Sequence, residues 1–378
     1  MRQQLSGFES SRESFVRLLA SWFRGAAREL PWRKTRDPYA IWVAEVMLQQ
    51  TQARTVVGYW ERWMRILPTP SDLASASTER ILKLWEGLGY YSRAMNLRRA
   101  AQMIQERWNG VFPSQEAQLL ELPGVGRYTA GAIGSIAFGK AVPIVDGNVA
   151  RVLARYLGIQ ENIQARASVD QLWAEARLLV EEAARQGHEG LLPPTPVRTV
   201  TGDFNEALME LGAVVCTVAT PRCGDCPVNA GCFARANGVA HELPRSAPKP
   251  KTFNSRNVAL LLEFNGRLLV QKRPKTGVNA NFWQFPQMSA PGTAALTTSR
   301  VRRLFGLGHE YALARVASIR HSVTRHRIVL EVFHGSGRGN ELLGGESSRW
   351  VTKSQLSRLP LTAAHRRIAK HPGVAPGP

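Results

Sequence analysis

Residues 216–232 read CTVATPRCGDCPVNAGC, and this run holds all four cysteines of the 378-residue chain: Cys216, Cys223, Cys226 and Cys232. Four thiols with no spare suit one tetrahedral metal or cluster site. Their spacing, C-x6-C-x2-C-x5-C, fits neither a zinc-finger pair nor the usual ferredoxin run. Because we find no export signal, we interpret the cysteines as ligands in a reducing compartment and not as disulfides.

The chain as a whole is strongly basic. It has 49 Lys plus Arg against 29 Asp plus Glu, which gives a net charge of +20. This charge predicts a polyanion partner such as nucleic acid, and a generic arginine-rich surface is the alternative. No apolar run approaches the roughly 18 residues of a membrane helix, so we expect no membrane span.

The type of secondary structure that the sequence predicts changes once along the chain. Residues from about 12 to 232 are predicted to form helices separated by glycine and proline, and a proline-rich basic stretch follows. Beyond it, Asn265-Gly266 separates two apolar runs and predicts a β-hairpin, and residues 328–333 predict another strand. We therefore predict a mainly α part (1–236), a linker (237–252), a smaller α+β domain (253–368) and a disordered tail (369–378).

Residues 122–127 read LPGVGR and precede a predicted helix. Gly124 and Gly126 permit a tight turn whose backbone N–H groups, at a helix N-terminus, suit a phosphodiester. The alternative is an ordinary junction between two helices. The string resembles the helix-hairpin-helix element, which grips DNA without reading its sequence.

Residues 143–151 read PIVDGNVAR and lead into another predicted helix. Taken alone, Asp146 or Asn148 could simply cap that helix. LPGVG, VDGNVxR and the four-cysteine run together resemble the endonuclease III superfamily of helix-hairpin-helix base-excision glycosylases, over residues 25–232. The resemblance implies a six-helix barrel plus an iron–sulfur domain, in which Cys216, Cys223, Cys226 and Cys232 ligate a 4Fe–4S cluster.

Two further stretches narrow the resemblance within that superfamily. Leu30-Pro-Trp-Arg33 and the run from Trp42 to Thr51, WVAEVMLQQT, resemble the adenine DNA glycosylases of the MutY type, which excise adenine paired with 8-oxoguanine or guanine. The resemblance implies that Glu45 is the catalytic acid. It also implies that Asp146 stabilises the cationic sugar or traps it covalently.

The residue after LPGVGR indicates whether the protein can also cleave the DNA strand. Bifunctional lyases of the superfamily have a lysine there, which forms a Schiff base with the opened sugar. This chain has Tyr128, and a phenol cannot form an imine. We therefore predict a monofunctional glycosylase without intrinsic strand-cleaving activity.

Glu45 also has a physical argument of its own. On a helix it lies beside Ile41 and Trp42, on the side toward which its side chain leans. Desolvation there raises the pKa of a carboxyl, which suits a general acid. The alternative is a surface Glu paired with a base four residues on, but that residue is Gln49.

The resemblance carries over further contact residues. Those assigned to the adenine pocket are Arg28, Trp32, Arg33, Tyr128, Asn148 and Glu206. Those assigned to DNA or lesion contact are Gln50, Thr51, Leu88, Tyr90, Gly124, Gly126, Val323, Thr324 and Arg325. Glu206 has a rival interpretation as part of a capping pair with Asp203, and Leu88 and Tyr90 have one as ordinary packing between helices.

The C-terminal part resembles a Nudix fold that reads the 8-oxoguanine strand, on residues 268–274 and 282–286. Nudix hydrolases hold divalent metal on a glutamate-rich helix, but residues 298–307 are arginine-rich, so we expect recognition and not hydrolysis. Family members commonly carry a Phe-Ser-His loop, and this chain has Val323-Thr324-Arg325. Thr324 keeps a hydroxyl, and Arg325 is long enough to reach a phosphate or a guanine edge, but the departure leaves lesion preference undetermined by the sequence.

Two other functions remain as alternatives. A thymine or uracil mismatch glycosylase of the same superfamily is opposed by WVAEVMLQQT and by the extra C-terminal domain. A non-catalytic DNA-binding iron–sulfur protein is opposed by Glu45 and Asp146. We expect a monomer in the bacterial cytoplasm, at the nucleoid, acting on duplex DNA with A:8-oxoguanine or A:G mismatches; the sequence identifies no clamp or repair-protein partner.

Overall fold

The structure is a computed structural model. It describes residues 2–188, 198–247, 251–290, 292, 294–336 and 347–370. The chain divides into two compact units: unit 1 comprises residues 1–75 and 96–248, and unit 2 comprises 76–95 and 249–378. Among the described residues, no helix is both long and apolar enough to cross a membrane.

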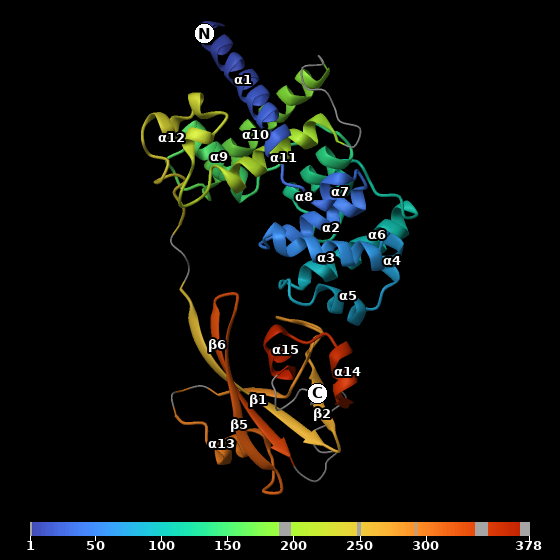
Figure 1. Cartoon of the computed structure of the whole chain (residues 1–378). Helices are drawn as coiled ribbons and strands as arrows, with labels where there is room; N and C mark the ends of the chain where they lie inside the picture. The colour runs from blue at the N-terminus through green and yellow to red at the C-terminus, as the bar shows by residue number, and fades with distance from the viewer. Residues whose placement is uncertain are drawn as a thin grey trace. The chain divides into compact units, whose positions relative to one another are not determined.

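Unit 1 is helical (Figure 1). Its core helices are α1 (Arg2–Ala26), α9 (Gly147–Leu157), α10 (Arg166–His188) and α11 (Val200–Val214), which bury one another's apolar faces. The remaining helices are α2 (Pro38–Leu48), α3 (Ala53–Ile66), α4 (Pro70–Ser75), α6 (Ser92–Trp108, whose first turn falls in unit 2), α7 (Glu116–Glu121), α8 (Arg127–Ala132) and α12 (Phe233–Ala236). A 3₁₀ turn spans Pro31–Lys34, and a π-helical turn, Ile133–Ala137, extends α8.

The LPGVGR hairpin joins α7 to α8. Gly124 has φ +80°, and a Cβ there would lie 2.6 Å from the Asn96 side chain, so only glycine fits this turn. Leu122 and Val125 are buried, whereas Gly124, Gly126 and Arg127 are exposed. The hairpin is therefore anchored by two apolar side chains and presents its backbone to solvent.

Unit 2 is built on a mixed seven-stranded sheet in the order β3-β2-β1-β6-β5, with β4 paired to β1 and β7 paired to β2. The strands are β1 (Phe253–Phe264), β2 (Arg267–Lys272), β3 (Trp283–Gln284), β4 (Gln287–Ser289), β5 (Ala312–Val323), β6 (His326–Ser336) and β7 (Ser348–Thr352). The predicted hairpin at Asn265-Gly266 is confirmed: β1 and β2 are antiparallel, and both turn residues have positive φ. The predicted strand at 328–333 lies within β6.

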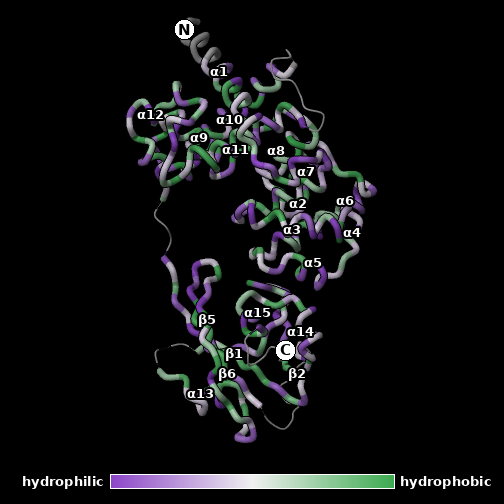
Figure 2. Tube along the Cα trace, in the orientation of Figure 1, coloured by the Kyte–Doolittle hydropathy of each residue, from purple (hydrophilic) through white to green (hydrophobic). Residues whose placement is uncertain are grey.

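The two faces of this sheet bury different clusters, because side chains alternate along β1. Ala259 and Leu261 pack with residues of α14 (Lys353–Arg358) and α15 (Ala363–Ala369). Val258, Leu260 and Leu262 pack with residues of α13 (Thr298–Phe305). The remaining helix of unit 2 is α5 (Thr78–Trp85). Hydrophobic residues recur along the elements of both units (Figure 2).

The segment predicted as a linker, 237–252, has two parts in the structure. Leu243 is buried and its carbonyl accepts from the Arg155 guanidinium at 2.8 Å, while the Arg245 carbonyl accepts from Ile163 N at 3.0 Å. Residues 237–247 therefore belong to unit 1, with Leu243 as a buried anchor. Residues 248–250, and residues 371–378 of the predicted tail, lie outside the described residues, and Ala369 ends α15.

Candidate active site and cysteine cluster

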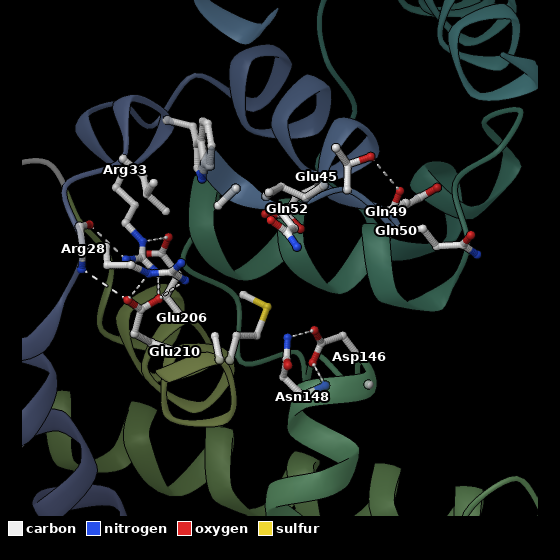
Figure 3. A pocket seen from close by; sticks show the side chains of 18 of the residues that line it. Arg28, Arg33, Glu45, Gln49, Gln50, Gln52, Asp146, Asn148, Glu206 and Glu210 are labelled. Carbon is white, nitrogen blue, oxygen red and sulfur yellow. Dashed lines mark hydrogen bonds and ion pairs between the residues drawn. The ribbon is translucent and has the colours of Figure 1, made fainter. Parts of the chain in front are cut away.

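One cavity of about 990 Å³ in unit 1 collects the side chains that the sequence singled out. Its lining includes both predicted catalytic residues and all six of the predicted adenine-pocket residues: Glu45, Asp146, Arg28, Trp32, Arg33, Tyr128, Asn148 and Glu206. Gln50 and Thr51, which follow α2 in the sequence, also line it. Segments up to 182 residues apart thus meet at one hollow (Figure 3).

Glu45 lies in the last turns of α2, where nearly every residue is buried. Its own exposure is 4%, with Ile41 at 2% and Trp42 at 1%. Burial raises the pKa of Glu45 to about 7. The hydrogen bond from Tyr128 lowers this pKa, and the negative charges of Glu206 and Asp146 raise it. The predicted rise of this pKa is therefore confirmed.

Tyr128 places its hydroxyl against Glu45. The O–H donates to Glu45 Oε2 at 2.5 Å, and Met209 Sδ lies 3.5 Å from the Tyr128 hydroxyl oxygen. Burial raises the pKa of Tyr128 well above its ordinary value, so the phenol stays protonated and remains a donor. None of the described residues that line the cavity is a lysine.

Asp146 is the N-cap of α9, as the capping interpretation allowed, and it also lines the cavity. Oδ1 accepts from the backbone N–H groups of Asn148 at 2.9 Å and Val149 at 2.7 Å, and Oδ2 accepts from Asn148 Nδ2 at 2.8 Å. Burial raises the pKa of Asp146, and these three hydrogen bonds act in the opposite direction. Capping and a place in the cavity are therefore compatible.

The far side of the cavity is an ion-pair network (Figure 3). Arg33 contacts Glu206 and Glu210 at 3.0 Å each, and Arg28 contacts Glu210 at 2.6 Å. Arg198 reaches Glu206 at 2.7 Å. Both carboxylates are nearly inaccessible, so each needs its guanidinium partners to offset the cost of burial.

The capping interpretation of Glu206 is wrong in one respect. Thr199, not Asp203, caps α11 by accepting from Gly202 N at 3.0 Å, so Glu206 lies inside the helix. Sequence reasoning missed Glu210 and Arg198. The spacing of Glu206 and Glu210, four residues apart on one helix face, was the available signal for Glu210.

Unusual backbone conformations mark the predicted DNA contacts. Within the part of the chain that the structure describes, the non-glycine residues with positive φ are four asparagines, which tolerate this region, and Gln50, Tyr90 and Thr324 at +57°, +46° and +52°. All three of the latter are predicted DNA or lesion contacts. Strain of this kind clusters at functional sites, where surrounding structure holds it.

The remaining predicted contacts lie in unit 2. Tyr90, Val323 and Thr324 line a second cavity of about 580 Å³. Thr324 and Arg325 form the two-residue tip between β5 and β6. Tyr90 is 51% exposed, whereas Leu88 is only 6% exposed and packs inward. The structure thus brings Tyr90 and Thr324 together and keeps Leu88 in the interior.

The four cysteines line one cavity in unit 1. Burial raises the pKa of Cys226 to about 11. The neighbouring cysteines act in the same direction, because thiolates placed together repel one another without a cation. Arg155 donates to Cys216 Sγ at 3.2 Å. Within the described residues, no three metal-binding side chains already have coordinating geometry, but the convergence of four thiols with a guanidinium donor fits a thiolate-bound cluster.

Comparisons with known proteins match both parts of the chain to known families. Residues 43–176 match the HhH-GPD superfamily of base excision DNA repair proteins, and residues 257–371 match the NUDIX domain. A human protein described as adenine DNA glycosylase is 33% identical over 95% of this chain and 74% of its own length. One from Mycobacterium tuberculosis is 38% identical over 66% of this chain and 76% of its length, and one from Arabidopsis thaliana is 37% identical over 78% and 50%.

Among solved structures, a thermostable thymine-DNA glycosylase covers 60% of this chain and 98% of its own, with 29% identity and a TM-score of 0.52. That likeness supports the helical architecture of unit 1.

Proposed function

Because this chain belongs to the adenine DNA glycosylase family, we propose that it hydrolyses the N-glycosidic bond of adenine paired with 8-oxoguanine or guanine, using Glu45 and Asp146. The observation that carries the assignment of residues is the shared cavity, in which Glu45 has a pKa of about 7 and lies beside Tyr128 and Asp146. At neutral pH a useful fraction of Glu45 is therefore protonated while Asp146 is held by three hydrogen bonds.

The first step requires a proton on the leaving base. Adenine anion is a poor leaving group, and protonation at N7 lets the base leave neutral. Tyr128 holds Oε2 of Glu45, which leaves the other carboxyl oxygen to carry the proton toward the base. This places Glu45 as general acid.

The second step concerns the sugar, which becomes cationic as the bond breaks. The Asp146 carboxylate stabilises that charge or adds to the sugar carbon, as the second carboxylate does in glycoside hydrolysis. Water, deprotonated by Glu45 now acting as base, completes the reaction. The ordered N-cap position of Asp146 fixes its carboxylate before the substrate arrives.

Base extrusion precedes this chemistry and costs a few kcal/mol, least at a mismatch. We assign Gln50, Thr51 and Tyr90 to the gap and to the opposing base, and the exposed hairpin at Gly124 and Gly126 to the phosphate backbone. Thr324 and Arg325 are assigned to the lesion strand. A Thr324→Ala, Arg325→Ala variant should lose preference for 8-oxoguanine over guanine opposite adenine, and an unchanged ratio would remove that role.

The four cysteines are assigned to a 4Fe–4S cluster that organises the loop 216–232 for DNA binding. When bound, the cluster supplies a structural tie among the four thiolates. Arg155, 2% exposed, supports the same loop by donating to the carbonyls of Thr217 at 2.7 Å and Val218 at 3.2 Å. The excision chemistry belongs to Glu45 and Asp146. We also propose the bacterial nucleoid as the location of the protein, in keeping with its charge of +20.

The deciding experiment uses duplexes with A opposite 8-oxoguanine, A opposite G, and T opposite G, scored for strand breaks with and without alkali. We expect breaks only after alkali and only for the two adenine mismatches. Breaks without alkali would contradict the argument from Tyr128, and cleavage of the T:G duplex would favour the thymine mismatch alternative. Glu45→Gln should lower the excision rate by orders of magnitude and leave binding largely intact.

A further inference from the structure

Residues 76–95 belong to unit 2 although unit 1 surrounds them in the sequence. This segment carries α5 and, directly after it, the loop Gly87–Tyr91 with the exposed Tyr90. The proposed function assigns Tyr90 to DNA. The contacts between this segment and residues 249–378 therefore affect the position of the Tyr90 side chain.

The start of α5 is held by Glu79. Its carboxylate accepts from the indole Nε1 of Trp283 at 2.9 Å and from Lys272 Nζ at 3.3 Å. The hydrogen bond from Trp283, with the charge of Lys272, keeps the pKa of Glu79 below its ordinary value. An ionised Glu79 is thus bound to β2 and β3.

The end of α5 is held more tightly, by Glu86. Arg366 on α15 donates from Nε to Oε1 at 2.6 Å and from Nη2 to Oε2 at 2.9 Å. The side chains of Arg366 and Glu86 are only 20% and 13% exposed. A bidentate, largely shielded pair of this kind is stronger and more directional than a surface pair. Lys83 adds a bond to Glu86 at 2.9 Å and one to the Ser357 carbonyl at 2.7 Å.

The loop after Glu86 is wrapped around one guanidinium. Arg93, 8% exposed, donates to the carbonyls of Leu88 at 3.2 Å and Gly89 at 3.1 Å. It also lies over the rings of Trp85 and Tyr90, at 5.3 and 5.6 Å from their centroids. These contacts fix Tyr90, in its left-handed conformation, relative to the end of α5.

We propose that the Glu86–Arg366 ion pair is a positioning device through which the C-terminal domain sets the placement of Tyr90 for mismatch recognition. Glu86 and Arg366 touch no substrate in this proposal; they act through α5 and the Gly87–Tyr91 loop. Tyr90 and Thr324 then face one cavity as parts of a single unit, so probing of the base pair and sensing of the lesion are coupled. The inference rests on the proposed function for the role of Tyr90.

The test uses Glu86→Gln, Arg366→Met and the double variant in the full chain. The first readout is the ratio of dissociation constants for duplexes with 8-oxoguanine and guanine opposite 2′-fluoro-2′-deoxyadenosine, whose glycosidic bond resists cleavage because fluorine destabilises the cationic sugar. The second readout is amide hydrogen exchange in peptides covering 85–95. Neither readout requires excision.

We expect each single variant to reduce the preference for 8-oxoguanine by about fivefold, with the double variant no worse than Glu86→Gln alone, because both singles break the same Glu86–Arg366 pair. Exchange in 85–95 should be faster. The matched control is Glu175→Gln, which breaks the bidentate Arg12–Glu175 pair of unit 1, with Nε–Oε1 3.0 Å and exposures of 28% and 15%. It should leave both readouts unchanged.

An unchanged binding ratio with faster exchange would reduce the pair to a structural contact and overturn the proposal. An unchanged exchange rate would overturn it as well, because the pair would then not hold the loop. Absence of adenine excision by the wild-type protein would contradict the proposed function instead, and the two readouts above would still decide the ion pair.

Discussion

The Tyr128 hydroxyl donates to Oε2 of Glu45 at 2.5 Å, and this contact joins the hairpin helix α8 to the helix that carries the proposed acid. The donor stabilises the ionised form of Glu45, so it opposes the effect of burial on that pKa. Tyr128 therefore tunes how much of Glu45 is protonated near pH 7.

Tyr128→Phe should raise the pKa of Glu45 further, because it removes the one hydrogen bond that favours the carboxylate. The alkaline limb of the single-turnover rate, which falls as Glu45 loses its proton, should move to higher pH. The measurement is the pH profile of adenine excision. A limb at the same pH in both proteins would show that Glu45 is not the titrating acid.

Glu45→Gln should lower the excision rate by roughly 10²- to 10⁴-fold, the usual contribution of a general acid. It should also stabilise the protein at alkaline pH. The pKa of Glu45 in the folded protein, about 7, exceeds its ordinary value of 4.5, so the free energy of unfolding of the wild type falls as pH rises from 4.5 through 7. Above pH 7 the full cost of burying the ionised carboxylate applies. That cost is about 3 kcal/mol.

The check is the difference in unfolding free energy between Glu45→Gln and wild type at pH 5 and pH 8.5. The gain should be clearly larger at pH 8.5. Equal gains at both values would mean that the folded protein does not bury an ionised Glu45 at alkaline pH.

Glu210→Ala should destabilise unit 1 by about 3–5 kcal/mol, because it leaves the buried Arg33 with only one of its two carboxylate partners. The Glu210 side chain is 1% exposed. The control is Glu121→Ala, at the exposed pair with Arg107, which should cost less than about 1 kcal/mol. Denaturant unfolding measures both, and equal costs would contradict the network as a buried charge cluster.

Thr324→Asn should raise the stability of unit 2 by about 1 kcal/mol, because asparagine adopts the left-handed region at lower cost than a β-branched residue. The same variant should weaken lesion preference if the strained hairpin tip is built for contact. Arg325→Ala, at the other tip position, should leave the melting temperature unchanged. A lower melting temperature for Thr324→Asn would show that the Thr324 hydroxyl, which donates to the Val323 carbonyl at 2.7 Å, outweighs the strain.

Cys226→Ser should lower the iron and acid-labile sulfide content of the purified protein, and DNA affinity should fall before the excision step is affected. The physical reason is that the loop 216–232 depends on the four thiolates for its shape, whereas Glu45 and Asp146 are held by α2 and α9. Iron analysis and binding titrations measure this. Full iron content in the variant would remove Cys226 from the ligand set.

The sequence by itself identified the turn chemistry of this protein and its family. The positive φ of Gly124 favours glycine, and Asn265-Gly266 alone specifies a hairpin, so both turns are local properties readable from residue type. The raised pKa of Glu45 was also predictable, because the residues that desolvate it, Ile41 and Trp42, lie on its own helix.

Tertiary structure alone decided which charged groups, distant in the sequence, pair with one another. Glu210 pairs with Arg28, 182 residues away, and residues 76–95 join unit 2 through Glu86 and Arg366, 280 residues apart. No local pattern encodes such pairs, because an isolated glutamate has the same sequence signature whether it is solvated or buried against an arginine. The inward packing of Leu88 and the left-handed backbone of Gln50, Tyr90 and Thr324 likewise depend on long-range packing, which overrides local preference.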